Sequence, residues 1–342
     1  KSYSEVAGLE LPDWFTSREG DFLFSLVDVE VSDGIATVRL NRPEAMNALY
    51  ETLMAQLGEA VKELNLRDDV STIVLEGAGK AFVAGADVKF FVDKIREDAF
   101  QDIYNFTAFG HEVLNSIESS PKTTIALTTG LALGGGLELA LSCDYRVGTG
   151  RTQFRFPETS IGIFPGLGGT QRTVRICGVE AARFAVLAGN FLDARTARAL
   201  GLLTHRVAHS EISKTIAELA STGKPDSKFP GNPSDPANAV ASFAESFYSD
   251  ANLDSIMSGE VPEGFDSEDP QVGRQIRSLA RVAPLALLTT SELLNRAVET
   301  GDELSVGLQA ELDSLETIFG TNDALEGLSS LVEGRRPVYS GT

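Results

Sequence analysis

Two glutamates lie beside glycine-rich runs, and the first of them stands in a segment that is otherwise without charge. Glu138 is the only charged residue between Lys122 and Asp144, just behind three glycines at 134–136 that open a helix-like pattern. Burial of that helix would leave the carboxyl group in apolar surroundings, which raises a carboxyl pKa and suits an acid–base role. A solvent-facing position on the helix is the plain alternative for Glu138.

The second glutamate, Glu158, follows the short strand-like run 153–156 and stands directly behind Pro157. Proline fixes the local backbone, as a side chain aimed at one reacting atom requires. The glycine-rich run 162–170 then opens another helix. Glu158 could instead be an ordinary carboxylate on a surface turn, but a second carboxylate favours an acid–base role for both glutamates.

Two segments of small residues could supply backbone hydrogen-bond donors. The run 81–87, Ala-Phe-Val-Ala-Gly-Ala-Asp, joins a buried strand to a helix, and its small side chains let a ligand approach exposed N–H groups. The glycines 134–136 expose N–H groups at the positive end of a helix dipole, which suits a developing oxyanion. A tight packing turn explains the first segment equally well on its own, and a triple glycine is a weak signal by itself.

The elements that must position these groups repeat the order strand, strand, helix. A hairpin turn at Asp33-Gly34 joins the first two strands. Strand patterns are predicted at 23–31, 35–40, 72–75, 123–128, 145–147 and 153–156, and helical periodicity at 46–66, 100–117, 168–176 and 180–188. The order suggests a coiled stack of similar turns, although the sequence contains no matching internal repeat.

Four segments divide the chain. We expect a lead-in at 1–21, a core at 22–207, an insertion or linker lobe at 208–271 and a helical C-terminal segment at 272–342. Composition marks the lobe, because residues 224–269 hold five prolines and many Ser and Asp residues around a helix-like patch at 237–248. Helical patterns return at 272–280, 285–298, 306–319 and 324–332.

Composition excludes several classes of function. The 342 residues include 49 acidic and 29 basic ones, and the net charge of −20 is a poor match for nucleic acid. No apolar run is long enough to cross a bilayer and no secretory signal is visible, so we expect no membrane contact and a cytoplasmic protein. Cys143 and Cys177 fit reduced structural thiols, and the three histidines lack the spacing of metal ligands.

Taken together, these segments resemble the two signatures of the crotonase superfamily, in order and in spacing. The resemblance covers about residues 22–207 and the C-terminal helices up to Arg335-Arg336-Pro337. It implies an α/β fold in which strand-strand-helix turns form a spiral with a C-terminal helical segment. It also implies homotrimers or dimers of trimers, an acyl-CoA thioester as substrate, and no cofactor besides the coenzyme A of that substrate.

Motif by motif, the resemblance assigns oxyanion-hole donors to the backbone N–H groups of Ala86 and Gly135, and the catalytic pair to Glu138 and Glu158. In family hydratases such a pair holds one water, activates it for attack at C3 of an enoyl-CoA and delivers a proton to C2. Substrate or coenzyme A contacts are implied for Ala84, Gly85, Asp87, Lys89, Gly134, Pro157 and Gly166, with Lys89, Arg335 and Arg336 as candidate partners of phosphates. Ordinary solvated charge is the alternative for the lysine and the two arginines.

Two retained glutamates favour hydration over double-bond isomerisation, because family isomerases usually keep one carboxylate. Hydroxyisobutyryl-CoA hydrolases resemble the chain in having an insertion after the core, but they lack the first glutamate and carry an aspartate where Gly166 stands. A non-catalytic acyl-CoA-binding scaffold is the alternative from a different class.

Two further features leave questions open. Arg155 and Phe156 replace the small and amide residues often found before the second glutamate, so the sequence does not fix the acyl-chain preference. The arrangement also resembles the hydratase half of archaeal fusions with a 3-hydroxyacyl-CoA dehydrogenase. No dinucleotide-binding glycine fingerprint follows an early strand here, so such a partner would be fused or associated from outside this sequence.

Overall fold

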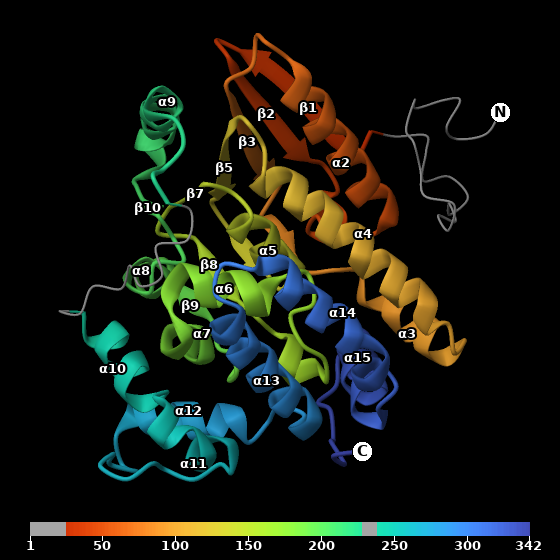
Figure 1. The fold of residues 1–342 in the computed structure, drawn as a ribbon, viewed down its shortest axis with the longest axis vertical. Helices are drawn as coiled ribbons and strands as arrows, with labels where there is room; N and C mark the ends of the chain where they lie inside the picture. The colour runs from red at the N-terminus through yellow and green to blue at the C-terminus, as the bar shows by residue number, and fades with distance from the viewer. Residues whose placement is uncertain (1–24, 228–237) are drawn as a thin grey trace.

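The computed structural model describes residues 25–227 and 238–342 (Figure 1). The lead-in predicted at 1–21 lies outside these residues. Ten strands in the described part form two sheets, a six-stranded sheet in the order β1-β2-β3-β5-β7-β10 and a four-stranded sheet in the order β4-β6-β8-β9. Neighbouring strands run parallel except in the pairs β1–β2 and β8–β9.

The bounds of the elements are as follows. The strands are β1 Val27–Ser32, β2 Ile35–Leu40, β3 Thr72–Gly77, β4 Ala81–Ala84, β5 Thr123–Thr128, β6 Leu131–Leu133, β7 Tyr145–Gly148, β8 Gln153–Arg155, β9 Leu192–Asp193 and β10 His205–Arg206. The helices are α2 Glu51–Leu66, α3 Val88–Arg96, α4 Phe100–Glu118, α5 Gly135–Leu141, α6 Gly169–Cys177, α7 Val179–Val186, α8 Ala194–Ala199, α9 Ile212–Thr222, α10 Ala239–Phe247, α11 Leu253–Met257, α12 Pro270–Leu279, α13 Pro284–Thr300, α14 Leu304–Phe319 and α15 Asn322–Glu333. Short 3₁₀ helices lie at η1 Pro43–Ala45, η2 Glu158–Ile161, η3 His209–Glu211 and η4 Asp250–Asn252.

Successive turns of the chain repeat one pattern. The strands β3, β5 and β7 are consecutive neighbours in the larger sheet. Along the chain each of them is followed by a strand of the smaller sheet, namely β4, β6 and β8. A helix follows each pair. The predicted α/β spiral of strand-strand-helix turns is therefore confirmed. The turns share an order of elements rather than side chains, which is why no sequence repeat accompanies them.

The predicted hairpin is confirmed, with β1 and β2 antiparallel around Asp33 at φ 51° and Gly34 at φ 79°. Positive φ at both central residues matches the right-handed twist of the flanking strands. The helix predicted from residue 46 begins later, at Glu51. Met46 and Asn47 adopt left-handed backbone conformations, with φ 50° and 58°, which end any helix there.

Asn47 explains why the chain makes this detour. Its side chain is buried, and its amide nitrogen donates to the carbonyls of Ala78, Ala81 and Phe82. An asparagine tolerates the left-handed region better than most residues. The loop before α2 is thereby fixed to β4, beside the predicted ligand-binding run.

The helices predicted near the C-terminus are confirmed as α12 to α15. Figure 1 shows α12 beside α10 and α11, whereas the other three lie against the spiral: α13 packs on α6 and α7, α14 on α4, and α15 on α3. The rings of Phe91 in α3 and Phe319 in α14 stack with centroids 5.2 Å apart. The end of the chain thus covers the face of the spiral that carries the glycine-rich segments.

The core is apolar and contains both cysteines. Cys143 and Cys177 are both buried, as expected of structural thiols. The helix predicted inside the lobe at 208–271 is α10, which packs against α7 and α8. In the part of the chain that the structure describes, no helix has both the length and the apolar character needed to cross a membrane.

Candidate active site

A cavity of about 390 Å³ lies between the spiral and the C-terminal helices. One wall carries the glycine-rich segments and both predicted glutamates, and the other is apolar. The apolar lining comes from α3, α4, the loop after η2, and α14 and α15: Phe91, Phe106, Phe164, Leu315, Phe319 and Leu328. A cavity with a few polar groups on one wall and an apolar surface on the other suits a ligand that has a hydrocarbon part and one reacting polar end.

Two backbone N–H groups at this wall are open to a ligand. Leu49 forms backbone hydrogen bonds on both sides of Ala86. The Leu49 N–H donates to the Gly85 carbonyl at 2.9 Å, and the Leu49 carbonyl accepts from the Asp87 N–H at 2.8 Å. Within the described residues the Ala86 N–H between them has no acceptor. Gly135 is the first residue of α5, so its N–H has no partner within the helix. Both residues line the cavity, and the two N–H groups can bind a carbonyl oxygen there.

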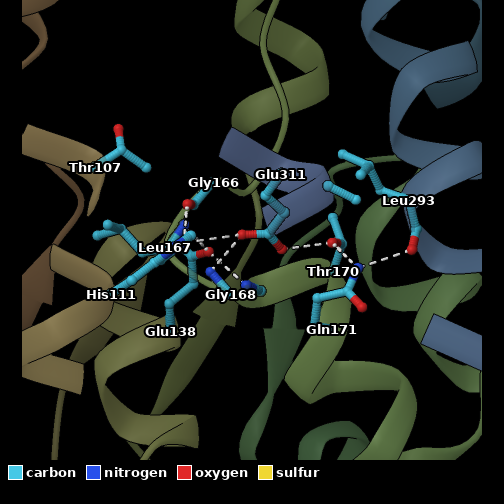
Figure 2. Close-up of polar contacts among 12 residues, drawn as sticks. Thr107, His111, Glu138, Gly166, Leu167, Gly168, Thr170, Gln171, Leu293 and Glu311 are labelled. Carbon is cyan, nitrogen blue, oxygen red and sulfur yellow. Dashed lines mark hydrogen bonds and ion pairs between the residues drawn. The ribbon is translucent and has the colours of Figure 1, made fainter. Parts of the chain in front are cut away.

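Glu138 lies on the first turn of α5 and is 2% exposed. Its Oε1 accepts two backbone hydrogen bonds, from the N–H groups of Leu167 and Gly169, each at 2.7 Å. Figure 2 shows the carboxylate beneath this turn of the chain. Both bonds reach Oε1 and fix the orientation of the carboxylate. The other oxygen, Oε2, can then interact with a ligand in the cavity that Glu138 lines.

Glu158 begins η2, directly after Pro157, and is 7% exposed. Among the described residues its Oε2 has no hydrogen-bond partner. A buried carboxylate oxygen without a partner is costly, and such groups are rare unless water or a ligand serves them. Because Glu158 lines the cavity, a bound water or ligand can supply the missing partner.

The glycines explain how the two carboxylates approach each other. A Cβ atom added to Gly134 would lie 2.3 Å from Glu158 Oε1, and one added to Gly135 would lie 3.9 Å from Glu138 Oε2. The two carboxylates therefore flank the same dipeptide, which also carries the free N–H of Gly135. Gly134 has φ 47° and ψ −124°, a conformation that a side chain would strain.

Burial raises the pKa of both carboxyl groups. For Glu138 burial is the largest cause, followed by the negative charges of Glu158 and Glu311, while the two N–H bonds act in the opposite direction. Burial raises the pKa of Glu158 to about 8, opposed by a bond to its own backbone and by the charge of Arg155. Two carboxylates this close share protons, so near neutral pH we expect one charged and one protonated carboxyl group.

The raised pKa of Glu158 predicts how stability depends on pH. Between pH 4.5 and about 8 the folded chain holds a proton on Glu158 that the unfolded chain has lost, so the free energy of unfolding falls as pH rises. Glu158→Gln removes this dependence. We expect the gain in Tm of Glu158→Gln over the wild type to be larger at pH 8 than at pH 5 in thermal unfolding.

The exposed residue Glu263 provides a control for that measurement. Glu263→Gln removes the same charge from the protein surface, so its Tm relative to the wild type should differ little between the two pH values. Equal Tm differences for Glu158→Gln at pH 5 and pH 8 would contradict the assignment of a raised pKa to Glu158.

The structure gathers most of the residues that the sequence placed near a ligand. In addition to the glutamates and the two N–H donors, the cavity lining includes Ala84, Gly85, Gly134, Pro157 and Gly166. Two predicted contacts lie elsewhere. The Asp87 carboxylate caps α3 by accepting from the Lys89 N–H, and it lies 3.5 Å from the Arg42 guanidinium. Lys89 lies in the first turn of α3, and its side chain is exposed.

The two arginines predicted to meet phosphates lie beyond α15. The Arg335 guanidinium is held by Glu326, with bonds of 2.6 and 2.7 Å, and by Glu333 at 2.5 Å. Arg336 is exposed. Arg335 would have to leave two carboxylates to bind a phosphate, so its assignment as a coenzyme A contact stays a prediction.

Arg155, the unusual residue before the second glutamate, lies at the edge of the cavity. Its Nε donates to the Gly189 carbonyl at 2.6 Å, its second guanidinium nitrogen to Ser160 Oγ at 3.3 Å, and its charge lies over the ring of Phe191. Burial lowers the pKa of this guanidinium. These contacts hold the side chain in place, and its positive charge opposes the rise in the pKa of Glu158.

The sequence did not single out the residues that hold Glu138. Gly166 is predicted as a substrate contact, but residues 167–170 are predicted only as a glycine-rich helix entry. His111 is assessed only as a metal ligand, and Glu311 is not predicted as a site residue. Glu311 did carry a detectable signal, because it lies on the same face of α14 as the buried residues Leu308 and Leu315. An acidic residue on the apolar stripe of a helix is a candidate for a specific buried role.

Comparisons with known proteins agree with this site. A family model described as enoyl-CoA hydratase/isomerase matches residues 35–340. A protein of Rhizobium meliloti named "Probable enoyl-CoA hydratase" is 38% identical over 311 residues, which are 91% of this chain and 96% of that protein. The short-chain-enoyl-CoA hydratase of Clostridium acetobutylicum is 35% identical over 195 residues, 57% of this chain and 73% of that protein.

Solved structures support the fold independently. The crystal structure of a carnitinyl-CoA dehydratase from Mycobacterium thermoresistibile superposes with a TM-score of 0.78 over 92% of each chain, at 24% sequence identity. Because the sequence identity is low, this structural similarity supports the fold alone. The family match, in contrast, spans the chain from β2 to beyond α15. The chain is therefore an enzyme of the enoyl-CoA hydratase/isomerase family, within the crotonase superfamily.

Proposed function

We propose that this enzyme is an enoyl-CoA hydratase, which adds water in syn fashion to a trans-2-enoyl-CoA and forms a 3-hydroxyacyl-CoA. The observation that carries the proposal is the pair of buried carboxylates on one cavity wall. Glu138 is fixed by two N–H bonds, and Glu158 has an oxygen without a partner. Moving a double bond takes one proton carrier, whereas adding water takes one group to remove a proton and another to supply one.

In the proposed mechanism the thioester carbonyl oxygen binds between the N–H groups of Ala86 and Gly135. Water, held by Glu138 and Glu158, attacks C3 and gives a proton to the charged carboxylate. The π electrons move toward the carbonyl, and the two N–H donors stabilise the enolate oxygen. The protonated carboxyl group then gives its proton to C2, so the product gains one water and the pair again holds one proton.

The apolar wall suggests the acyl chain. Phe91, Phe106 and Phe319 line the cavity together with the two carboxylates, and its volume of about 390 Å³ favours a short hydrocarbon chain over an extended one. Relatives named crotonyl-CoA hydratase and short-chain-enoyl-CoA hydratase support the same choice. Crotonyl-CoA is therefore the first substrate to try.

One spectroscopic experiment separates the candidate activities. Hydration removes the enoyl-thioester absorbance of crotonyl-CoA without releasing thiol. Isomerisation of a 3-enoyl-CoA creates that absorbance, and thioester hydrolysis releases free coenzyme A. A scaffold would bind crotonyl-CoA without turnover. Absence of hydration with crotonyl-CoA and longer enoyl-CoAs would reject the proposal, and each of the other signals would name its replacement.

We also propose a homotrimer or a dimer of trimers in solution, as the resemblance implies. Light scattering coupled to size-exclusion chromatography measures the number of 36.5 kDa chains directly. The cytoplasmic location and a fused or associated 3-hydroxyacyl-CoA dehydrogenase stay predictions from the sequence.

A further inference from the structure

The turn that holds Glu138 is itself held by a second buried carboxylate, Glu311 of α14. Glu311 Oε2 accepts from the Gly168 N–H at 2.7 Å, and its Oε1 accepts from the Thr170 hydroxyl at 2.5 Å. Three successive N–H groups thus alternate between two carboxylates, since those of Leu167 and Gly169 bind Glu138 while that of Gly168 binds Glu311. Figure 2 shows both carboxylates converging on this turn.

A histidine from a third element completes the arrangement. His111 Nε2 lies 2.7 Å from the Gly166 carbonyl oxygen and 3.2 Å from Glu311 Oε2. A carbonyl oxygen can only accept, so Nε2 carries a hydrogen. His111 belongs to α4, so the turn is bonded by α4 on one side and by α14 on the other.

Energetics argue against a purely structural role for Glu311. Its side chain is fully buried, and an ionised carboxylate in such surroundings is costly even when its oxygens are bonded. An apolar residue would join α14 to the core without that cost. Glu311 also stands close enough to Glu138 to raise the pKa of that carboxyl group, so its presence disfavours the charged form of Glu138. Both costs are explained if the bonds made by Glu311 serve the reaction.

We propose that Glu311, together with His111, is a positioning residue that fixes the turn 166–170 so that its N–H groups orient the Glu138 carboxylate for catalysis. The inference rests on the proposed hydratase function. Glu311 touches the turn and not the reacting atoms, so its loss affects the reaction step rather than substrate binding. A misplacement of a catalytic group by about 1 Å costs about 10²-fold in rate.

The test compares Glu311→Ala with a matched control, Asp144→Ala. Asp144 is also a buried carboxylate, and it accepts from the backbone N–H and the hydroxyl of Thr124, away from the cavity. For Glu311→Ala we expect kcat with crotonyl-CoA to fall about 10²-fold with KM changed about two-fold or less. Asp144→Ala should lower Tm by a similar amount and leave kcat near the wild-type value. Glu311→Gln, which keeps an acceptor for the Gly168 N–H, should restore most of kcat.

A second measurement does not depend on turnover. Hydrogen-exchange mass spectrometry of the peptide spanning residues 164–172 should show faster exchange in Glu311→Ala than in the wild type, and no change in Asp144→Ala. If Glu311→Ala does not fold, Thr170→Val removes one of the three bonds to the same carboxylate and takes its place, with the same expected direction in kcat and exchange.

The outcomes separate the two proposals. An unchanged kcat and unchanged exchange at 164–172 would overturn the positioning role of Glu311 while leaving hydration intact. A fall in kcat equal to that of the control, at equal loss of Tm, would also overturn it. An inactive wild type would reject hydration, and the exchange experiment would still decide whether Glu311 fixes the turn.

Discussion

Replacing Glu138 or Glu158 with glutamine is expected to lower kcat for hydration of crotonyl-CoA by about 10²- to 10⁴-fold each. Glutamine keeps the size of the side chain but can neither accept the proton of water nor return one to C2. The pair acts as a unit, so the double variant should be little slower than the slower single variant. Loss of the enoyl-thioester absorbance measures all three rates.

Two controls keep this result specific. Each variant should still bind a saturated acyl-CoA, because the N–H groups of Ala86 and Gly135 and the apolar wall are unchanged. Exposed Glu263→Gln should hydrate at the wild-type rate. If either glutamine variant retained a rate within a few-fold of the wild type, the two-carboxylate mechanism would be wrong even though hydration itself is observed.

The second large effect is expected from a single added methyl group, in Gly134→Ala. The new Cβ would lie 2.3 Å from Glu158 Oε1, so either the carboxylate or the entry to α5 must move. Movement of the carboxylate displaces Glu158, and movement of the helix entry displaces the Gly135 N–H, so either change disturbs a group that the proposed reaction needs. Because loss of one oxyanion donor alone costs about 10²- to 10³-fold, we expect kcat to fall by at least that factor. Steady-state hydration of crotonyl-CoA provides the measurement.

Gly301 supplies a matched control for the backbone. It has φ 52° and ψ −119°, against 47° and −124° for Gly134, and no atom of the residues that the structure describes lies within 4 Å of the position of an added Cβ. Both alanine variants therefore carry similar backbone strain, about 1–3 kcal/mol. Gly301→Ala should lose stability and keep its rate. Equal effects of the two variants on kcat would show that strain, and not the contact with Glu158, is responsible.

Part of this site could be predicted from the sequence, for physical reasons. Glu138 stands alone in an apolar segment and Glu158 is fixed by a proline, so their burial and placement have local causes. The strands β4 and β6 were missed because they have only four and three residues, all of them apolar. Such short runs show no alternation of apolar and polar side chains that would indicate a strand. The start of α2 was wrong because Met46 and Asn47 adopt left-handed conformations imposed by long-range bonds of the Asn47 amide.

The support of Glu138 could not be predicted in this way. Periodicity placed a helix at 306–319 and could have identified Glu311 as an acid on its buried face. Its partners Gly168 and His111 lie 143 and 200 residues away along the chain, and no local pattern records such contacts. The two glutamates are therefore visible in the sequence, whereas the residues that hold one of them in place emerge only from the fold.

The position of α14 has a consequence for the synthesis of the protein. Gly169, which binds Glu138, is made about 150 residues before Phe319, which closes the cavity, and this interval lasts about 8 to 30 s at ordinary rates of translation. During that time the spiral can form while its glycine-rich wall and two acidic side chains still face water. The chain on the ribosome therefore exposes this apolar wall until α14 has been made, and the cavity can close only after that helix has packed on α4.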